Sequence, residues 1–188
     1  MIKVGDPKAI INGDGTVTVN GKSPRLYIYK KNKDVEFSAE VCVEDDVEIA
    51  HLIARSKHQD EPKHTKFGGY YLYADFKDQK LYFKKEETHL KKYTDRIPEP
   101  GKPITFEKNK WYPMKISVKN IADEKVQIKG DFNGTRISMV DDGTLVKTHK
   151  NGKKEEKGPP FREEGSCCFI RTNAPNNVKY RNVIMRQI

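Results

Sequence analysis

The sequence predicts an all-β protein with minimal helix, built as an antiparallel two-sheet β-sandwich of the jelly-roll type. Two long segments, 35–43 and 111–119, alternate apolar and polar residues as half-buried strands do. Asn133-Gly134 joins two further alternating segments, and this dipeptide suits the type I′ turn of a β-hairpin. Short alternating segments recur along the chain while long helical periodicity is absent, which is typical of sandwiches and jelly rolls.

The expected strands follow one another along most of the chain. They are residues 16–19, 25–29, 35–43, 51–56, 69–76, 79–85, 111–119, 126–132, 136–140, 166–172 and 178–185. Residues 86–93 are compatible with one short helix. The proline-rich segment 95–110 and the Lys-, Glu- and Gly-rich segment 141–161 are expected to be the longest irregular loops.

Length and charge narrow the classes of function. At 188 residues, a single domain over residues 1–188 is expected. The net charge of +9 favours an acidic polysaccharide, nucleic acid or a membrane surface as partner, with a merely solvated lysine-rich surface as the alternative.

No apolar run approaches the roughly 20 residues that span a bilayer. No signal peptide is visible after Met1, so the protein is either intracellular or begins after a removed leader. The oligomeric state stays open.

The three cysteines do not define a compartment. Cys42, Cys167 and Cys168 lack the paired spacing of a zinc site. Free buried thiols are the favoured state, because cysteine is common in cores. A disulfide between Cys42 and Cys167 remains the alternative, if their strands are neighbours.

Three alternating runs between residues 51 and 85 contain the candidate site. In a strand, successive side chains point to opposite faces, so alternation separates a core face from an outer face. The side chains expected in the core, here and elsewhere, are Leu52, Ala54, Leu72, Ala74, Leu81, Phe83, Met114, Ile116, Ile128 and Ile170. The opposite, open face is expected to collect the ligand-binding residues His51, Arg55, Tyr71, Tyr73, Tyr82 and Lys84. Tyrosines can stack on sugar rings, and the guanidinium of Arg55 can hold a carboxylate through two parallel hydrogen bonds.

The order of several motifs resembles the concanavalin A-like lectin/glucanase superfamily. The motifs are NGDGTVTVNG and RLYIYKKNKDVEFSAEVCVED, then HLIARSKH and FGGYYLYADF, then NKWYPMKISVKN and VQIKGDFNGTRISMVDDG, and finally GSCCFIRTNAPNNVKYRNVIMRQI. The ending is similar to that of laminarinase-like members, and a LamG-like domain is a related comparison. The resemblance covers nearly the whole chain. It implies a jelly roll that binds glycans on a concave sheet, and an extracellular or cell-surface location.

Departures from that superfamily leave open whether the chain is an enzyme. The Glu-x-Asp-x-x-Glu strand of the retaining glucanases is absent, and so are the Gln-Ile-His and Tyr-Lys-x-Gly-x-Tyr strands of the alginate lyases. Glu36 and Glu40, like the adjacent Glu86-Glu87, are interpreted as solvated surface carboxylates.

Three hypotheses follow. The favoured one is a carbohydrate-binding module for an acidic polysaccharide. The second is a uronate lyase, in which Arg55 neutralises the substrate carboxylate while His51 or His58 and Tyr71 or Tyr73 act as base and acid; a glycoside hydrolase is less favoured. The third, and least favoured, is a basic nucleic-acid-binding protein that uses scattered pairs such as Lys84-Lys85.

No cofactor is expected, although a structural calcium ion has candidate ligands. Asn12, Asp14, Asp141 and Asp142 offer side-chain oxygens, and calcium takes six to eight oxygen ligands. Asn12-Gly13-Asp14-Gly15 is also an ordinary turn sequence, and this interpretation is favoured.

Overall fold

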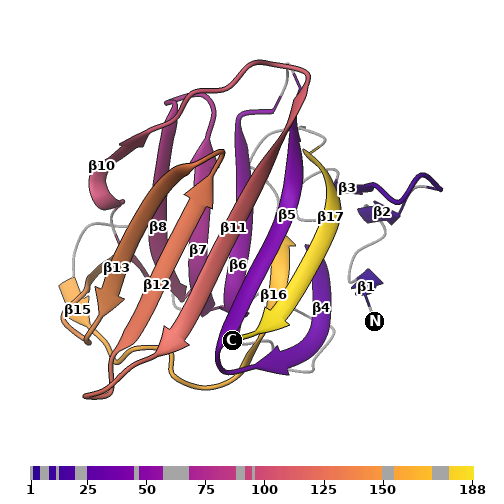
Figure 1. Ribbon diagram of the computed structural model, residues 1–188. Helices are drawn as coiled ribbons and strands as arrows, with labels where there is room; N and C mark the ends of the chain where they lie inside the picture. Colours follow the sequence, from indigo (N-terminus) through magenta and orange to yellow (C-terminus); the bar gives the residue numbers. More distant parts are fainter. Residues whose placement is uncertain are drawn as a thin grey trace.

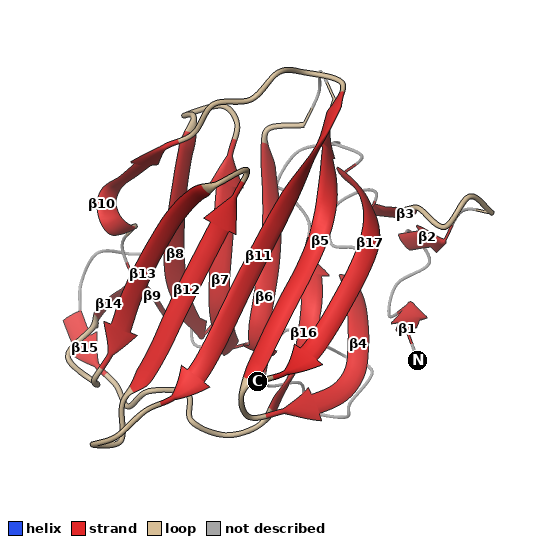
Figure 2. Ribbon diagram, viewed as in Figure 1, coloured by secondary structure: helices blue, strands red, loops and turns tan. Residues whose placement is uncertain are grey.

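The computed structural model describes residues 2–4, 9–11, 13–19, 25–44, 47–56, 68–87, 92–94, 96–149, 155–170 and 178–188. Within these ranges every regular element is a β-strand and no helix occurs (Figure 2). The strands form two antiparallel sheets that lie face to face (Figure 1). The predicted all-β sandwich is therefore confirmed.

The large sheet has ten strands within the described ranges, in the order β1-β4-β16-β6-β7-β8-β9-β14-β15, with β10 paired to β8. These strands are β1 (Ile2–Val4), β4 (Arg25–Asn32), β6 (Ile49–Ser56), β7 (Gly68–Asp75), β8 (Lys80–Glu87), β9 (Lys92–Thr94), β10 (Ile97–Pro103), β14 (Val146–His149), β15 (Glu155–Lys157) and β16 (Gly165–Ile170). It is the rear layer in Figure 1.

The small sheet, the front layer in Figure 1, has the order β13-β12-β11-β5-β17-β3-β2 among the described strands. Its strands are β2 (Ala9–Ile11), β3 (Val17–Val19), β5 (Val35–Val43), β11 (Lys110–Asn120), β12 (Val126–Phe132), β13 (Thr135–Asp141) and β17 (Val178–Gln187). The hairpin predicted at Asn133-Gly134 joins β12 to β13. Both residues have positive φ, +48° and +82°, as a type I′ turn requires.

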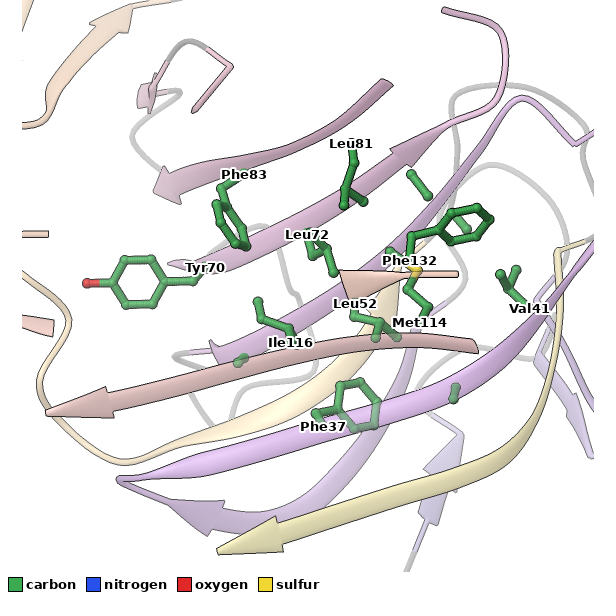
Figure 3. Close-up of a cluster of buried hydrophobic side chains, with 14 of the residues drawn as sticks. Phe37, Val41, Leu52, Tyr70, Leu72, Leu81, Phe83, Met114, Ile116 and Phe132 are labelled. Carbon is green, nitrogen blue, oxygen red and sulfur yellow. The ribbon is translucent and has the colours of Figure 1, made fainter. Parts of the chain in front are cut away.

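The core fills the space between the two sheets (Figure 3). Phe37, Val41, Met114, Ile116 and Phe132 come from the small sheet, and Leu52, Tyr70, Leu72, Leu81 and Phe83 come from the large sheet. Nine of the ten predicted core side chains are buried; the tenth, Ile170, has a side chain outside the described set. The alternation of β5 and β11 is thus explained by one face of each strand packing into this core.

Two expectations about irregular segments are wrong. A short helix is expected at residues 86–93, but the described residues of that segment are strand, because Glu86 and Glu87 end β8 and residues 92–94 form β9. The expected loop 95–110 contains β10, and the expected loop 141–161 contains β14 and β15. β10 pairs with β8 with a register shift between Ile97 and Lys102, and prolines are tolerated in such edge positions because their missing N–H is not needed there.

Neither of the two described cysteines forms a disulfide. Cys42 and Cys167 are both buried and unbridged, as favoured from the sequence. Their strands, β5 and β16, belong to different sheets, which removes the alternative of a cross-strand disulfide. The side chain of Cys168 lies outside the described set. No helix able to cross a membrane is found in the described ranges.

Candidate functional site

Three neighbouring strands of the large sheet, β6, β7 and β8, build the candidate site. Their register places His51 opposite Tyr73 and Tyr73 opposite Tyr82, and it places Tyr71 opposite Lys84. Alternate side chains of these strands enter the core, so the others lie on the outer face. We call this outer set the tyrosine face; it comprises His51, Ile53, Tyr71, Tyr73, Asp75, Lys80, Tyr82, Lys84 and Glu86.

Tyr73 is the centre of the tyrosine face. Its ring is stacked on that of Tyr82, with centroids 4.9 Å apart and planes 11° apart, and more loosely on that of Tyr71 at 6.0 Å. The His51 ring meets Tyr73 edge-on, with centroids 4.2 Å apart. Such offset and edge-to-face contacts are favourable ring geometries. The rings therefore hold one another in a continuous row across three strands.

Charged groups lie over the row of rings. The ammonium nitrogen of Lys84 is 5.8 Å from the Tyr73 centroid, and the guanidinium carbon of Arg96 is 4.7 Å from the Tyr82 centroid. Both distances are within the range of cation–π attraction. Arg96 also makes ion pairs with Asp78 at 2.7 Å and with Asp75 at 3.6 Å.

Two carboxylates accept hydrogen bonds from tyrosines of the row. The Tyr73 hydroxyl donates to Glu86, and the Tyr82 hydroxyl donates to Asp75 across 3.4 Å. Burial and the nearby Glu86 carboxylate raise the pKa of the Tyr73 hydroxyl well above its ordinary value. Burial also raises the pKa of Glu86. At neutral pH the Tyr73 hydroxyl is therefore a protonated hydrogen-bond donor.

The tyrosine face is much less open than expected. Tyr71, Tyr82 and His51 expose only 4%, 3% and 6% of their surface, and Glu86 exposes 7%. Tyr73, Lys80 and Lys84 are half-buried and keep partial access to solvent. The predicted gathering of aromatic and basic residues on one face is found, but the expectation of an open platform is wrong. Tyr73, Lys80 and Lys84 are therefore the most accessible members of the tyrosine face.

Arg55 does not point outward as the alternation suggested. A register shift between Ser166 and Cys168, on the adjoining strand β16, interrupts the pairing beside it, and Arg55 itself has φ +52°. A Cβ on Gly165 would lie 2.6 Å from the Arg55 backbone, so glycine is needed for this approach. The guanidinium is wholly buried and donates to Lys33 O, Asn120 Oδ1, Phe161 O and Asp34 Oδ1 at 2.6–3.1 Å. The expected exposed anion clamp at Arg55 is therefore wrong.

A second cluster of buried polar side chains lies next to the hydrogen-bonded cluster around Arg55. The ammonium of Lys85, on the core side of β8, pairs with Asp141 Oδ2 at 2.7 Å and donates to the Pro159 carbonyl at 2.7 Å. The Tyr70 hydroxyl donates to the same Asp141 oxygen at 2.7 Å and accepts from the Phe161 N–H at 2.8 Å. These contacts attach residues 158–161 to the sandwich. Since Lys85 is enclosed, the Lys84-Lys85 pair cannot act as an exposed basic patch.

The calcium candidates are used in other ways. Asp14 Oδ1 accepts from the backbone N–H and the hydroxyl of Thr16, which is the turn favoured from the sequence. Asp142 makes the same pattern with Thr144. The Asp141 carboxylate is neutralised by Lys85, so the assignment of Asp141 as a calcium ligand is wrong. Asn12 and His58 lie outside the described residues, which contain no group of three or more His, Cys, Asp or Glu suited to a metal ion.

Sequence reasoning missed three members of the site. Glu86 was interpreted as a solvated carboxylate, Asp75 was not counted among the ligand-binding residues, and Arg96 lay in a segment expected to be a loop. The alternation itself carried the signal for Glu86, because it follows Tyr82 and Lys84 at a spacing of two residues. No local signal in the sequence brings Arg96 to Tyr82.

Comparisons with known proteins support the fold. No protein-family model and no curated protein sequence matches the chain. Among solved structures, the carbohydrate-binding module CBM66 from Bacillus subtilis superposes with a TM-score of 0.62 at 13% identity, covering 99% of this chain and 95% of that one.

Two further solved structures are similar to the chain, and they come from different kinds of protein. One, from B. subtilis, is described as of unknown function with a galectin-like fold; its TM-score is 0.63 at 13% identity, with coverage of 100% and 88%. The other is the β-glucanase of Bacillus licheniformis, with a TM-score of 0.60 at 8% identity and coverage of 100% and 92%. A binding module and a glucanase on one fold separate architecture from activity. The chain thus has the jelly-roll β-sandwich fold that these structures share, which is the fold its motifs implied.

Proposed function

We propose that this chain is a carbohydrate-binding module that holds an acidic polysaccharide or glycan on the tyrosine face of its large sheet. The observation that carries the proposal is the row of stacked rings centred on Tyr73, with Lys84 over that ring and carboxylates that accept hydrogen bonds from the Tyr73 and Tyr82 hydroxyls. Aromatic rings with polar tips combine apolar ring edges with hydrogen-bonding groups, as an amphipathic sugar ring requires. A site of action outside the cell or at its surface forms part of the same proposal.

The preference for an acidic glycan rests on charge. The chain carries a net charge of +9, which attracts polyanions over a distance. Lys84 and Lys80 are half-buried on the same face, whereas Arg96 is held by Asp78 and Asp75. Lys84 is therefore our candidate for contact with a sugar carboxylate, in the role first given to Arg55.

Binding without chemistry is the better-supported use of this face. β-Elimination on a uronate requires a group that neutralises the substrate carboxylate, a base and an acid. Arg55, the expected neutraliser, is enclosed by protein acceptors. The Tyr73 hydroxyl, with its raised pKa, stays protonated, and its proton is donated to Glu86 in this structure. Recognition through stacking and hydrogen bonds needs neither group to ionise.

A glycan array followed by titration calorimetry on four variants tests the proposal. We expect binding to at least one acidic glycan, a loss of about tenfold or more in affinity for Tyr73→Ala, and little change for Tyr73→Phe. Lys84→Gln should weaken acidic ligands selectively. Lys129→Gln is the matched control, because Lys129 is an exposed lysine on the outer face of the small sheet.

Other outcomes decide against the proposal in distinct ways. Ultraviolet absorbance from unsaturated uronate products, abolished by Tyr73→Phe, would make the chain a lyase. Binding only to DNA or RNA, with affinity falling steeply as salt rises, would support the nucleic-acid hypothesis. Glycan binding whose affinity and stoichiometry are both unchanged by Tyr73→Ala in a folded variant would rule out the tyrosine face.

A further inference from the structure

The outer face of the small sheet carries a cluster of side chains on three neighbouring strands, β11, β5 and β17. The register aligns Trp111 with Cys42 and Cys42 with Lys179, and in the next row it aligns Pro113 with Glu40 and Glu40 with Arg181. The residues between these, such as Tyr112, Val41 and Tyr180, enter the core. Trp111, Glu40 and Arg181 therefore share the outer face, on the side of the sandwich opposite the tyrosine face.

A β-bulge lies next to Arg181. The pairing of β17 with β5 shifts between Arg181 and Ile184, and Asn182 has φ +51°. Bulges of this kind interrupt the regular alternation and redirect side chains. Asparagine tolerates the left-handed conformation better than most residues do. The backbone at this point is therefore specialised, where a plain strand would pair without interruption.

Arg181 is held from two directions. Its guanidinium carbon lies 4.3 Å from the centroid of the Trp111 ring, and its Nε donates to Glu40 Oε2 at 2.5 Å. The hydrogen bond from Arg181 lowers the pKa of Glu40, so the carboxylate stays ionised. Among the described residues, none accepts a hydrogen bond from the two terminal nitrogens of Arg181, and its side chain is 42% exposed.

Two other arginines show what is special about this arrangement. Arg55 uses its guanidinium entirely on protein acceptors. Arg136, on the same outer face as Arg181, also binds a carboxylate through Nε, at 3.0 Å to Asp131, but its side chain is 83% exposed. Arg181 combines the fixed orientation of Arg55 with the solvent accessibility of Arg136. A guanidinium fixed in this way loses less entropy on forming further hydrogen bonds.

We propose that Trp111, Arg181 and Glu40 form a second binding site, which takes the carboxylate of an acidic sugar residue. The terminal nitrogens of Arg181 present the parallel N–H groups that fit a carboxylate. The half-buried indole supplies a flat apolar surface beside it, and Glu40 can accept a sugar hydroxyl. Glu40 and Glu44 balance the charges of Arg181 and Lys179. A small free anion therefore gains little here, whereas a sugar acid adds contacts to the ring.

Trp111 gives this site its own signal, because it is the single tryptophan of the chain. Tryptophan fluorescence, excited where tyrosine does not absorb, is recorded while oligogalacturonate is added to the intact chain. We expect a saturable change that is weakened at least tenfold by methyl esterification of the oligomer and by Arg181→Gln. Sodium acetate at equal carboxylate concentration should produce no saturable change. Arg136→Gln, the matched arginine control, should bind as the unaltered chain does.

Tyr73→Ala separates this proposal from the function proposed above. A change in tryptophan fluorescence that survives Tyr73→Ala supports the second site, whatever becomes of binding at the tyrosine face. The second site is overturned if oligogalacturonate leaves the fluorescence unchanged. It is overturned equally if Arg181→Gln and Arg136→Gln weaken binding to the same extent, since that result would indicate only a diffuse attraction to positive charge.

Discussion

The two outer faces of this sandwich differ in how their polar residues are stabilised. On the small sheet, β11 alternates between buried and exposed residues along most of its length, and ion pairs such as Lys115–Glu36 lie at the surface. On the large sheet, β6 and β7 are buried almost without interruption. Their outward residues bond to one another, because polar groups removed from water require partners. The same two-residue alternation in sequence thus produces one solvated face and one shielded face.

The arginines illustrate the same contrast at the level of single residues. Arg55 is buried and its charge is satisfied by four acceptors, whereas Arg181 is partly exposed and stacked on an indole. The first contributes to stability and leaves no donor positioned for a ligand. Loss of Arg181 should change the stability of the fold little. Its two terminal guanidinium nitrogens donate no hydrogen bond to any described residue, so they are available to a ligand. Exposure, more than residue type, therefore distinguishes a structural arginine from a candidate binding arginine.

The largest expected effect separates these arginines by stability. Arg55→Met removes a buried charge and leaves Asp34 and three other acceptors without their donor, which should lower the free energy of unfolding by about 3–5 kcal/mol. Arg181→Met breaks a partly exposed pair and should cost about 0–1 kcal/mol. Urea denaturation measures both. Similar losses for the two variants would contradict the difference between the two regions.

An intermediate effect tests how closely the sheets approach. A Cβ added at Gly130 of β12 would lie 2.6 Å from Leu72 and 2.9 Å from Phe83, both on the large sheet. Gly130→Ala should therefore lower the free energy of unfolding by about 1–3 kcal/mol through overpacking. Ser138→Ala, on the exposed side of the neighbouring strand β13, is the control and should change it by less than about 0.5 kcal/mol. If the two substitutions are equally neutral, the sheets pack less tightly than described.

The smallest expected effects are changes of folding stability with pH, and they should have opposite signs for the carboxylates of the two faces. Burial raises the pKa of Glu86 above its ordinary 4.5, so the folded state binds this proton more tightly than the unfolded state does. The corresponding stability is present below that ordinary pKa and is lost as pH rises through the folded pKa. The hydrogen bond from Arg181 lowers the pKa of Glu40, so its contribution is present above the ordinary pKa and is lost as pH falls through the folded pKa.

Denaturation of Glu86→Gln and Glu40→Gln across the acid range measures this pair of effects. Relative to the unaltered chain, Glu86→Gln should gain stability as pH rises through the folded pKa of Glu86. Glu40→Gln should instead lose stability as pH rises through the folded pKa of Glu40. A common sign for the two variants would show that the carboxylates share one kind of environment.

Alternation and turn chemistry were enough to predict the sandwich, the hairpin at Asn133-Gly134 and nearly all of the expected core. They also placed Tyr71, Tyr73, Tyr82 and Lys84 together on one face. They could not predict the inward orientation of Arg55. That orientation depends on a bulge and on Gly165, which is distant in sequence but lies on the adjoining strand β16. Nor could they reveal that Arg96 covers Tyr82 or that Arg181 covers Trp111, because pairings between remote segments leave no periodic trace in the sequence.

The central claim, that the tyrosine face binds a glycan, is tested most directly by nuclear magnetic resonance on the isotope-labelled chain. The best acidic glycan from the array is added to saturation, and the shifts of backbone amides and tyrosine rings are mapped. The account predicts the largest changes at Tyr71, Tyr73 and Lys84, with additional changes at Trp111 and Arg181 if the second site also fills. Changes confined to other surfaces, with the signals of β6, β7 and β8 unmoved at saturation, would contradict it.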